Sequence, residues 1–228
     1  MPPQTTYNGA EALIRTLVSA GVTTCFTNPG TSEIHFVAAL DSVPEMRAVL
    51  TLFEGVATGA ADGYARMTDR PGATLLHLGP GLGNGLANLH NARRARVPVV
   101  NLIGNHATFH ARYDTPLQSD IETVARNVSA WVRTSRQADE LARDATEAIA
   151  AATGPPGQVA TLIVPADLSW REGVQATAPL GPAPQPTVSE ATIEAIAAAV
   201  RSSRRAGILL GGEALRGRGL IAAARIAA

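Results

Sequence analysis

The chain has 228 residues, 46% of them hydrophobic, which is enough for one sizeable domain, or for one domain and part of another. Its 19 basic and 19 acidic residues leave no formal net charge, so we expect neither nucleic acid nor an anionic membrane as a partner. Every basic residue is arginine, and without lysine the chain offers no Schiff-base amine and no P-loop lysine.

Short apolar runs alternate along the chain with longer segments of helical periodicity. Asn8 predicts the start of the first helix, since Leu13, Leu17 and Val18 follow at helical spacing. Further helices are expected at about 33–40, 54–67 and 138–152, and another follows a glycine-rich turn and ends at 91. Strands are expected at 22–27, 46–52, 73–78, 97–104 and 158–165. This order, with strands that are apolar throughout, predicts a doubly wound α/β domain whose mostly parallel sheet is buried on both faces.

This first domain is expected to span residues 1–170. Residues 171–187 carry four prolines in a polar, Ala/Gly-rich run, which predicts a linker. A helix at 188–202, a strand at 206–212 and a helical end then indicate a second α/β domain, 188–228. One strand and two helices cannot bury a sheet, so we expect the chain to stop inside that domain.

Nothing in the sequence indicates export or membrane insertion. The first residues lack the basic start and apolar run of a signal peptide, and no stretch approaches the ~20 apolar residues of a membrane span. The single cysteine, Cys25, lies in an expected strand, so we expect it to be buried and inert. A cytoplasmic protein is the default expectation.

A carboxylate, Glu54, directly follows the second expected strand and opens a helix that is thin because it carries Gly55, Gly59 and Gly63. Helix N-termini favour anions, so Glu54 has a purely structural interpretation as a first-turn residue. The glycines are unfavourable in a helix by roughly 0.8–1 kcal/mol each relative to alanine. That penalty indicates a packing or functional reason, such as close approach of another helix or subunit.

The third expected strand ends near His77 and leads into a turn at 79–85. A dinucleotide-binding Gly-x-Gly-x-x-Gly turn is disfavoured, because Asn84 stands where the third glycine belongs and no carboxylate follows about 20 residues later. His77 is either a core histidine or a catalytic one. After the first strand, Asn28, Pro29 and Gly30 make another turn, and Thr31 can cap the next helix.

The two turns and the Glu54 helix start all follow strands, and ligands bind at the carboxyl ends of strands in such sheets. Their combination, with Ala-Asp-Gly-Tyr-Ala-Arg at 61–66, resembles the pyrimidine-binding domain of the acetolactate synthase, pyruvate decarboxylase and benzoylformate decarboxylase family over residues 8 to about 172. The chain departs from that family in having Glu54-Gly55-Val56 for the common Glu-Gln-Gly, and Leu117-Gln118 for a Phe-Gln pair.

The resemblance implies a thiamine diphosphate (ThDP) enzyme that decarboxylates 2-oxo acids or joins them to an acceptor. Glu54 would activate the cofactor by bonding to its aminopyrimidine ring, and His77 would act as acid or base. The cofactor-binding residues would be Asn28, Pro29, Gly30, Glu54, Gly81, Gly83 and Asn84, and the substrate residues Thr31, His77 and Gln118.

The resemblance also implies partners and further cofactors. In the family, a C-terminal domain with a Gly-Asp-Gly…Asn motif holds the diphosphate and Mg²⁺, and this chain has no such motif. Active sites lie between subunits, so a homodimer or homotetramer is expected, and FAD is possible. The chain alone is expected to be inactive. The alternatives are a nicotinamide-dependent oxidoreductase and a non-catalytic assembly module of the same fold.

Overall fold

The computed structural model describes residues 5–181, 183–184 and 186–228, so positions 182 and 185 of the expected linker lie outside it. The chain forms two compact units, Met1–Ala183 and Pro184–Ala228. The expected linker is therefore divided between the units. No helix in the described part of the chain has both the length and the apolar character needed to cross a membrane.

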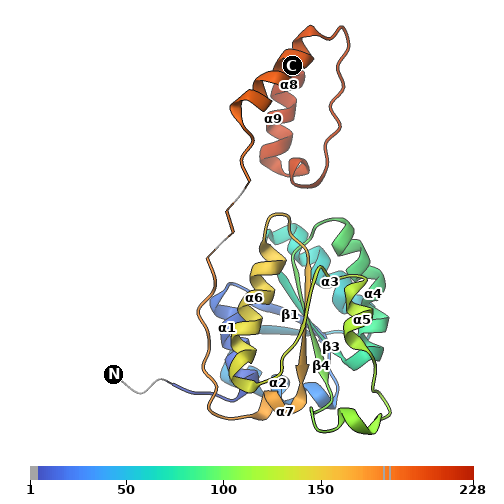
Figure 1. The fold of residues 1–228 in the computed structure, drawn as a ribbon, viewed down its shortest axis with the longest axis vertical. Coiled ribbons are helices and arrows are strands. Elements are labelled where there is room, and N and C mark those ends of the chain that lie inside the picture. Colours follow the sequence, from blue (N-terminus) through green and yellow to red (C-terminus); the bar gives the residue numbers. More distant parts are fainter. Residues whose placement is uncertain (1–4, 182, 185) are drawn as a thin grey trace. The chain divides into compact units, whose positions relative to one another are not determined.

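The first unit is built on one six-stranded, entirely parallel sheet (Figure 1). In spatial order the strands are β2 (Arg47–Leu50), β1 (Thr24–Asn28), β3 (Gly72–His77), β4 (Val99–Asn105), β6 (Val159–Pro165) and β5 (Trp131–Thr134). The doubly wound α/β fold predicted from the sequence is confirmed.

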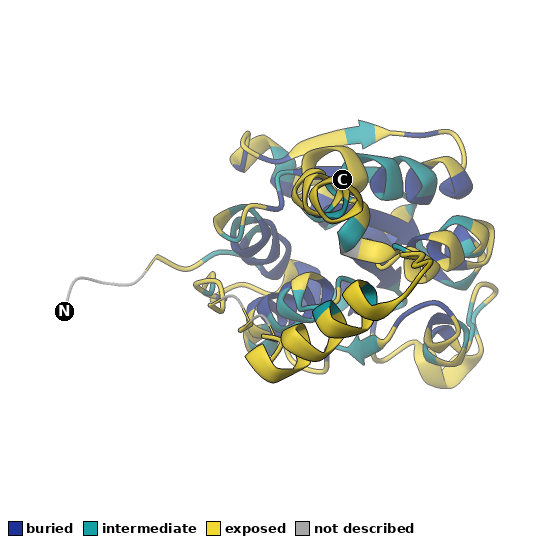
Figure 2. Ribbon diagram, turned by 90° about the horizontal axis from the view of Figure 1, so that it is seen from above, coloured by how far each residue is buried: buried dark blue, intermediate teal, exposed yellow. Residues whose placement is uncertain are grey.

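Helices cover both faces of this sheet and bury two apolar clusters against it. One cluster joins the sheet to α1 (Gly9–Ser19), α2 (Ile34–Ala39) and α6 (Leu141–Thr153). The other joins it to α3 (Glu54–Thr68), α4 (Leu78–Arg94) and α5 (Ile121–Arg126). The central strands β3, β4 and β6 are buried almost throughout (Figure 2). The expectation of burial on both faces is wrong for β2, an edge strand with three of its four residues exposed.

Four elements of the first unit differ from the sequence-based expectation. Helix α4 begins directly at the end of β3, so the predicted glycine-rich turn at 79–85 is the first part of a helix. Leu78 has a φ of 53°, so this single residue makes the turn. The structure also adds α5 and β5 between the strand expected at 97–104 and the helix expected at 138–152, and a short helix, α7 (Ala166–Trp170), after β6.

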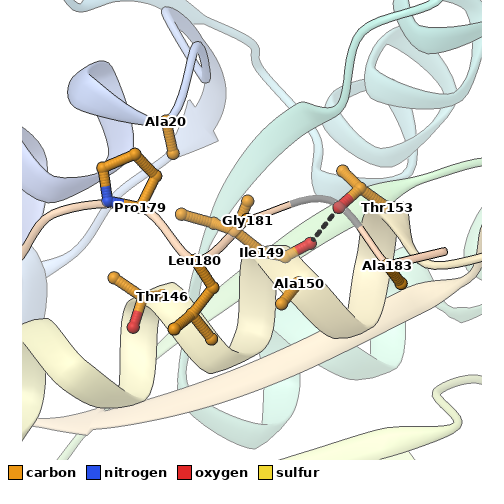
Figure 3. A pocket seen from close by; sticks show the side chains of 9 residues that line it. All are labelled: Ala20, Thr146, Ile149, Ala150, Thr153, Pro179, Leu180, Gly181 and Ala183. Carbon is orange, nitrogen blue, oxygen red and sulfur yellow. Dashed lines mark hydrogen bonds between the residues drawn. The ribbon is translucent and has the colours of Figure 1, made fainter.

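The segment after α7 packs along the first unit. Val174 pairs with Tyr7, and the Thr177 amide donates to the Thr16 hydroxyl at 3.0 Å. Further along, Pro179 and Leu180 line a small pocket against α6 (Figure 3). These contacts explain why the boundary between the two units falls near residue 183.

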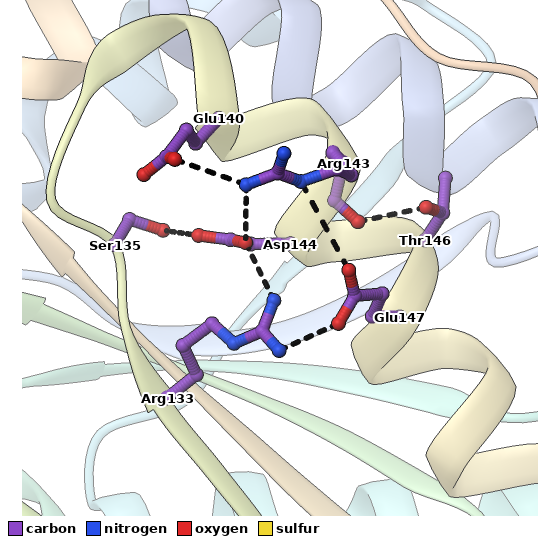
Figure 4. Close-up of polar contacts among 7 residues, drawn as sticks. All are labelled: Arg133, Ser135, Glu140, Arg143, Asp144, Thr146 and Glu147. Carbon is purple, nitrogen blue, oxygen red and sulfur yellow. Dashed lines mark hydrogen bonds and ion pairs between the residues drawn. The ribbon is translucent and has the colours of Figure 1, made fainter.

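Ion pairs fasten α6 to β5 on the outer edge of the sheet (Figure 4). Arg133 contacts Asp144 at 2.7 Å and Glu147 at 2.6 Å, and the Ser135 hydroxyl donates to Asp144 at 2.8 Å. The Asp144 side chain is only 3% exposed, so these partners replace the water that it loses.

The second unit contains α8 (Glu190–Ser202) and α9 (Gly217–Ala227), neither of which has a buried residue. The strand predicted at 206–212 is wrong, since 206–211 is irregular and a 3₁₀ turn, Gly212–Leu215, follows. A strand needs a neighbour to pair its backbone groups, and the described part of this unit supplies none.

Candidate functional site

The residues singled out in the sequence converge at the carboxyl edge of the sheet. Asn28 ends β1, and Pro29 and Gly30 lead into a 3₁₀ turn, η1 (Thr31–Glu33). Glu54 opens α3, and His77 is the last residue of β3. Because β1 lies between β2 and β3, their three exits are side by side.

Glu54 is 7% exposed and lies at the first position of α3. Its Oε2 accepts a hydrogen bond of 2.9 Å from the Asn84 side-chain amide, on α4. No residue in the described part of the chain bonds to its other oxygen, Oε1. A buried carboxylate is thus fixed by one oxygen and keeps the other for a ligand.

The glycines of α3 and α4 let these two helices touch. A Cβ on Gly85 would lie 2.8 Å from Thr58, and one on Gly59 would lie 2.9 Å from Asn88. Asn88 also donates to the Gly55 carbonyl oxygen at 2.7 Å. The expected close approach of another helix therefore occurs within this chain, and it holds Asn84 over Glu54.

His77 is paired with a second carboxylate, Glu33, which is 2% exposed. The His77 Nδ1 lies 2.8 Å from Glu33 Oε2, and the Gly30 amide donates to the same oxygen at 2.7 Å. Burial raises the pKa of the Glu33 carboxyl, against the opposing effects of the Gly30 hydrogen bond and of His77.

Glu33 was not predicted as a site residue, because in the sequence it is an ordinary first-turn residue after a helix cap. The signal that could have found it was positional. Glu33 follows β1, His77 ends β3, and these two strands are neighbours in the sheet.

Gly81 connects the two carboxylate sites. A Cβ on Gly81 would lie 3.4 Å from Glu54 Oε1 and 3.6 Å from the His77 Cβ. It reaches this position because Leu78, at its positive φ, turns the chain sharply from β3 into α4. Such a backbone conformation costs roughly 1–3 kcal/mol for a residue other than glycine and is concentrated at functional sites.

The remaining predicted residues are less closely tied to this centre. Thr31 is exposed on η1, and Gly83 is exposed on α4 with open space where a Cβ would be. Gln118 is half-buried in the loop after β4, and no described residue forms a hydrogen bond with its Oε1. Within the described part of the chain, Gln118 forms no hydrogen bond with Glu54 or His77.

The loop after β4 nevertheless comes close to His77. Ser119 lies against Gly79, at the start of α4. The pKa of His106 is lowered, chiefly by burial and also by the charges of His110 and His77. In the described part of the chain, the buried side-chain atoms without a hydrogen-bond partner are Glu33 Oε1, Gln118 Oε1 and two further atoms of this loop, His106 Nε2 and Thr115 Oγ1. Within the described ranges, no cluster of three His, Cys, Asp or Glu residues could hold a metal ion.

The model of the thiamine pyrophosphate enzyme N-terminal TPP-binding domain matches residues 7–125. The chain belongs to this enzyme family. The matched span contains Glu33, Glu54, His77 and Asn84, so the site just described lies inside the family's cofactor-binding domain.

Named relatives extend the comparison. A Mycobacterium tuberculosis protein with the provisional name acetolactate synthase large subunit IlvX is 60% identical over 219 residues, which are 96% of this chain and 42% of that protein. The benzoylformate decarboxylase of Pseudomonas aeruginosa is 31% identical over 153 residues, 67% of this chain and 28% of that enzyme. The acetolactate synthase isozyme 3 large subunit of Escherichia coli is 32% identical over 153 residues, 67% and 27% of the two chains.

A solved structure shows the same fold. The thiamine diphosphate-dependent 4-hydroxybenzoylformate decarboxylase of Rhodococcus jostii RHA1 superposes with a TM-score of 0.80 at 24% identity, covering 87% of this chain and 38% of that one. The chain thus spans less than half the length of each of these relatives.

Proposed function

We propose that this chain forms the cofactor-activating part of a ThDP-dependent enzyme that acts on 2-oxo acids. The observation that carries the proposal is the state of Glu54. It is a buried carboxylate at a helix start, with Oε2 held by Asn84 at 2.9 Å and Oε1 without a partner among the residues that the structure describes. A site that recognises one ring nitrogen needs one carboxyl oxygen that is held in place and is not bonded to another residue.

The residues around Glu54 fit an aminopyrimidine ring. Gly81 places no side chain beside the carboxylate, so a flat ring can approach the free oxygen. When bound, thiamine diphosphate supplies a thiazolium ring that accepts the electron pair released as CO₂ leaves a 2-oxo acid. Glu54 would hold a proton at Oε1 and donate it in a hydrogen bond to the ring nitrogen.

His77 would work on the substrate side of the same centre. It stands next to Gly81, whose other neighbour is Glu54. Histidine exchanges a proton near neutral pH, so His77 would take up or release one beside the reacting 2-oxo acid. Decarboxylation and acetolactate synthase-type carboligation both fit this arrangement.

The complete site would need a second subunit and further ligands. Leu52 is 92%, Val56 56% and Phe53 48% exposed, all within two residues of Glu54. Large exposed apolar side chains beside a buried carboxylate are suited to a subunit contact, which supports a homo-oligomer. The diphosphate and Mg²⁺ would be held by groups outside the described residues, and FAD remains a possible second cofactor.

Exchange of the thiamine C2 proton in D₂O tests this role, using holoenzyme that contains the chain. Glu54→Gln keeps the side-chain shape and removes the acid, and should slow exchange about 10²–10⁴-fold. His77→Ala should leave exchange unchanged and slow turnover. Glu45→Gln, at an exposed site of the same unit, is the control. Wild-type exchange in Glu54→Gln would show that Glu54 is only a helix-start carboxylate.

A further inference from the structure

Glu33 is more deeply enclosed than Glu54 and is not explained by the cofactor role. Its Oε2 accepts from the Gly30 amide at 2.7 Å and lies 2.8 Å from His77 Nδ1, while its Oε1 is buried and has no hydrogen-bond partner among the described residues. Burying a carboxyl group with one unsatisfied oxygen is unfavourable, so its presence needs a reason.

The ionised carboxylate of Glu33 determines which way the His77 bond runs. Its two oxygens can only accept, and Oε2 already accepts from the Gly30 amide. His77 must therefore carry a proton on Nδ1, and in neutral His77 the lone pair lies on Nε2. No described residue bonds to Nε2, and the side chain is 22% exposed.

Two glycines make room for this pair. Gly104 in β4 is in register with His77 in β3, and a Cβ on Gly104 would overlap Glu33 Oε1. A Cβ on Gly30 would lie 2.5 Å from the His77 ring at Nδ1 and Cε1. Any other residue at either position would push the carboxylate and the imidazole apart.

We propose that Glu33 is a positioning residue, which fixes His77 in the Nδ1–H tautomer and presents Nε2 as the proton acceptor of the site, with Gly104 as the space that Glu33 requires. The role of Nε2 toward a substrate rests on the proposed function. The tautomer itself does not, because it is determined by contacts within this chain.

The tautomer can be measured directly on the chain labelled with ¹⁵N-histidine. Long-range ¹H–¹⁵N correlation spectra distinguish a protonated from an unprotonated ring nitrogen. The His77 signals among the five histidines are identified by their loss in His77→Gln. Spectra are taken about two pH units above the ordinary histidine pKa of about 6.5, where imidazole is neutral. Wild type should show Nδ1–H alone.

Three variants then test the cause. Glu33→Leu removes the acceptor and should lose the single tautomer, giving signals of both forms. Glu33→Gln keeps an oxygen for the Gly30 amide and should retain Nδ1–H. Gly104→Ala leaves Glu33 in place but displaces it, and should behave like Glu33→Leu. Glu45→Gln is the control, and amide spectra confirm that each variant is folded.

Two results would overturn the proposal: an Nε2–H tautomer in wild type, or an unchanged Nδ1–H tautomer in folded Glu33→Leu or Gly104→Ala. The wild-type result alone decides the matter if both variants fail to fold. Failure of the proposed function is a separate outcome. In that case the His77→Ala holoenzyme would turn over substrate at the wild-type rate, while His77 of the wild-type chain would still show the Nδ1–H tautomer.

Discussion

Replacing Asn101 with leucine should destabilise the first unit, although no water-exposed atom changes. Asn101 is fully buried in β4, in register with Thr74 on β3 and Thr161 on β6. The Thr74 hydroxyl donates to its Oδ1 at 2.7 Å, and its Nδ2 donates to the Thr161 hydroxyl at 2.9 Å. Ser129 continues the chain to Thr161 at 2.6 Å. These bonds hold three central strands in the register that sets His77 opposite Gly104.

The magnitude follows from which groups lose their partners. In Asn101→Leu, Thr74 loses its acceptor, which costs about 1–3 kcal/mol for a buried polar group. Thr161 loses one bond but keeps Ser129, which costs about 0.5–1.5 kcal/mol. Leucine is no smaller than asparagine, so no cavity forms. We expect a total loss of about 2–4 kcal/mol in the free energy of unfolding.

Urea unfolding followed by tryptophan fluorescence measures this loss, since Trp131 and Trp170 both lie in the first unit. Adding Thr74→Val removes the hydroxyl that has lost its acceptor, so the double variant should be more stable than Asn101→Leu alone by about 1–3 kcal/mol. A wild-type free energy of unfolding for Asn101→Leu would contradict this prediction, and so would a double variant whose loss equals the sum of the two single losses.

Three further predictions concern charge and ligands. Burial raises the pKa of Cys25 to about 12, so the buried neutral thiol should stabilise the fold fully below about pH 9. This stabilisation should be lost as the pH rises from 9 to 12, at up to about 1.4 kcal/mol per pH unit. The free energy of unfolding, measured with urea, should therefore fall more steeply over this range for wild type than for Cys25→Ala. Asp144→Ala leaves Arg133 with Glu147 as its remaining ion-pair partner. Because the Arg133 side chain is 36% exposed, the free energy of unfolding should fall by about 1–3 kcal/mol, less than the 3–5 kcal/mol of a fully buried pair. Equal urea midpoints for this variant and wild type would contradict this. Calorimetric titration of the isolated chain with ThDP and Mg²⁺ should give a Kd above about 1 µM, and tighter binding would show that the chain holds the diphosphate itself.

The sequence by itself determined the alternation of strands and helices, the thin helix after Glu54 and the placement of His77 at the end of a strand. These features are local, because hydrophobic periodicity and glycine spacing act within a few residues. The same local patterns carried the family resemblance that the TPP-binding domain match over residues 7–125 bears out. The roles predicted for the site residues remain predictions.

Only the tertiary structure decided which side chains meet. Glu33 and His77 are 44 positions apart, and Glu54 and Asn84 are 30 apart, so strand order and register bring each pair together. The two wrong secondary-structure predictions also depend on contacts and backbone geometry that form only in the folded chain. The strand expected at 206–212 has no described neighbour to pair with, and the glycine-rich segment after His77 became helical because Leu78 makes the turn alone. Pairing partners and backbone strain are properties of the folded chain, and no local pattern records them.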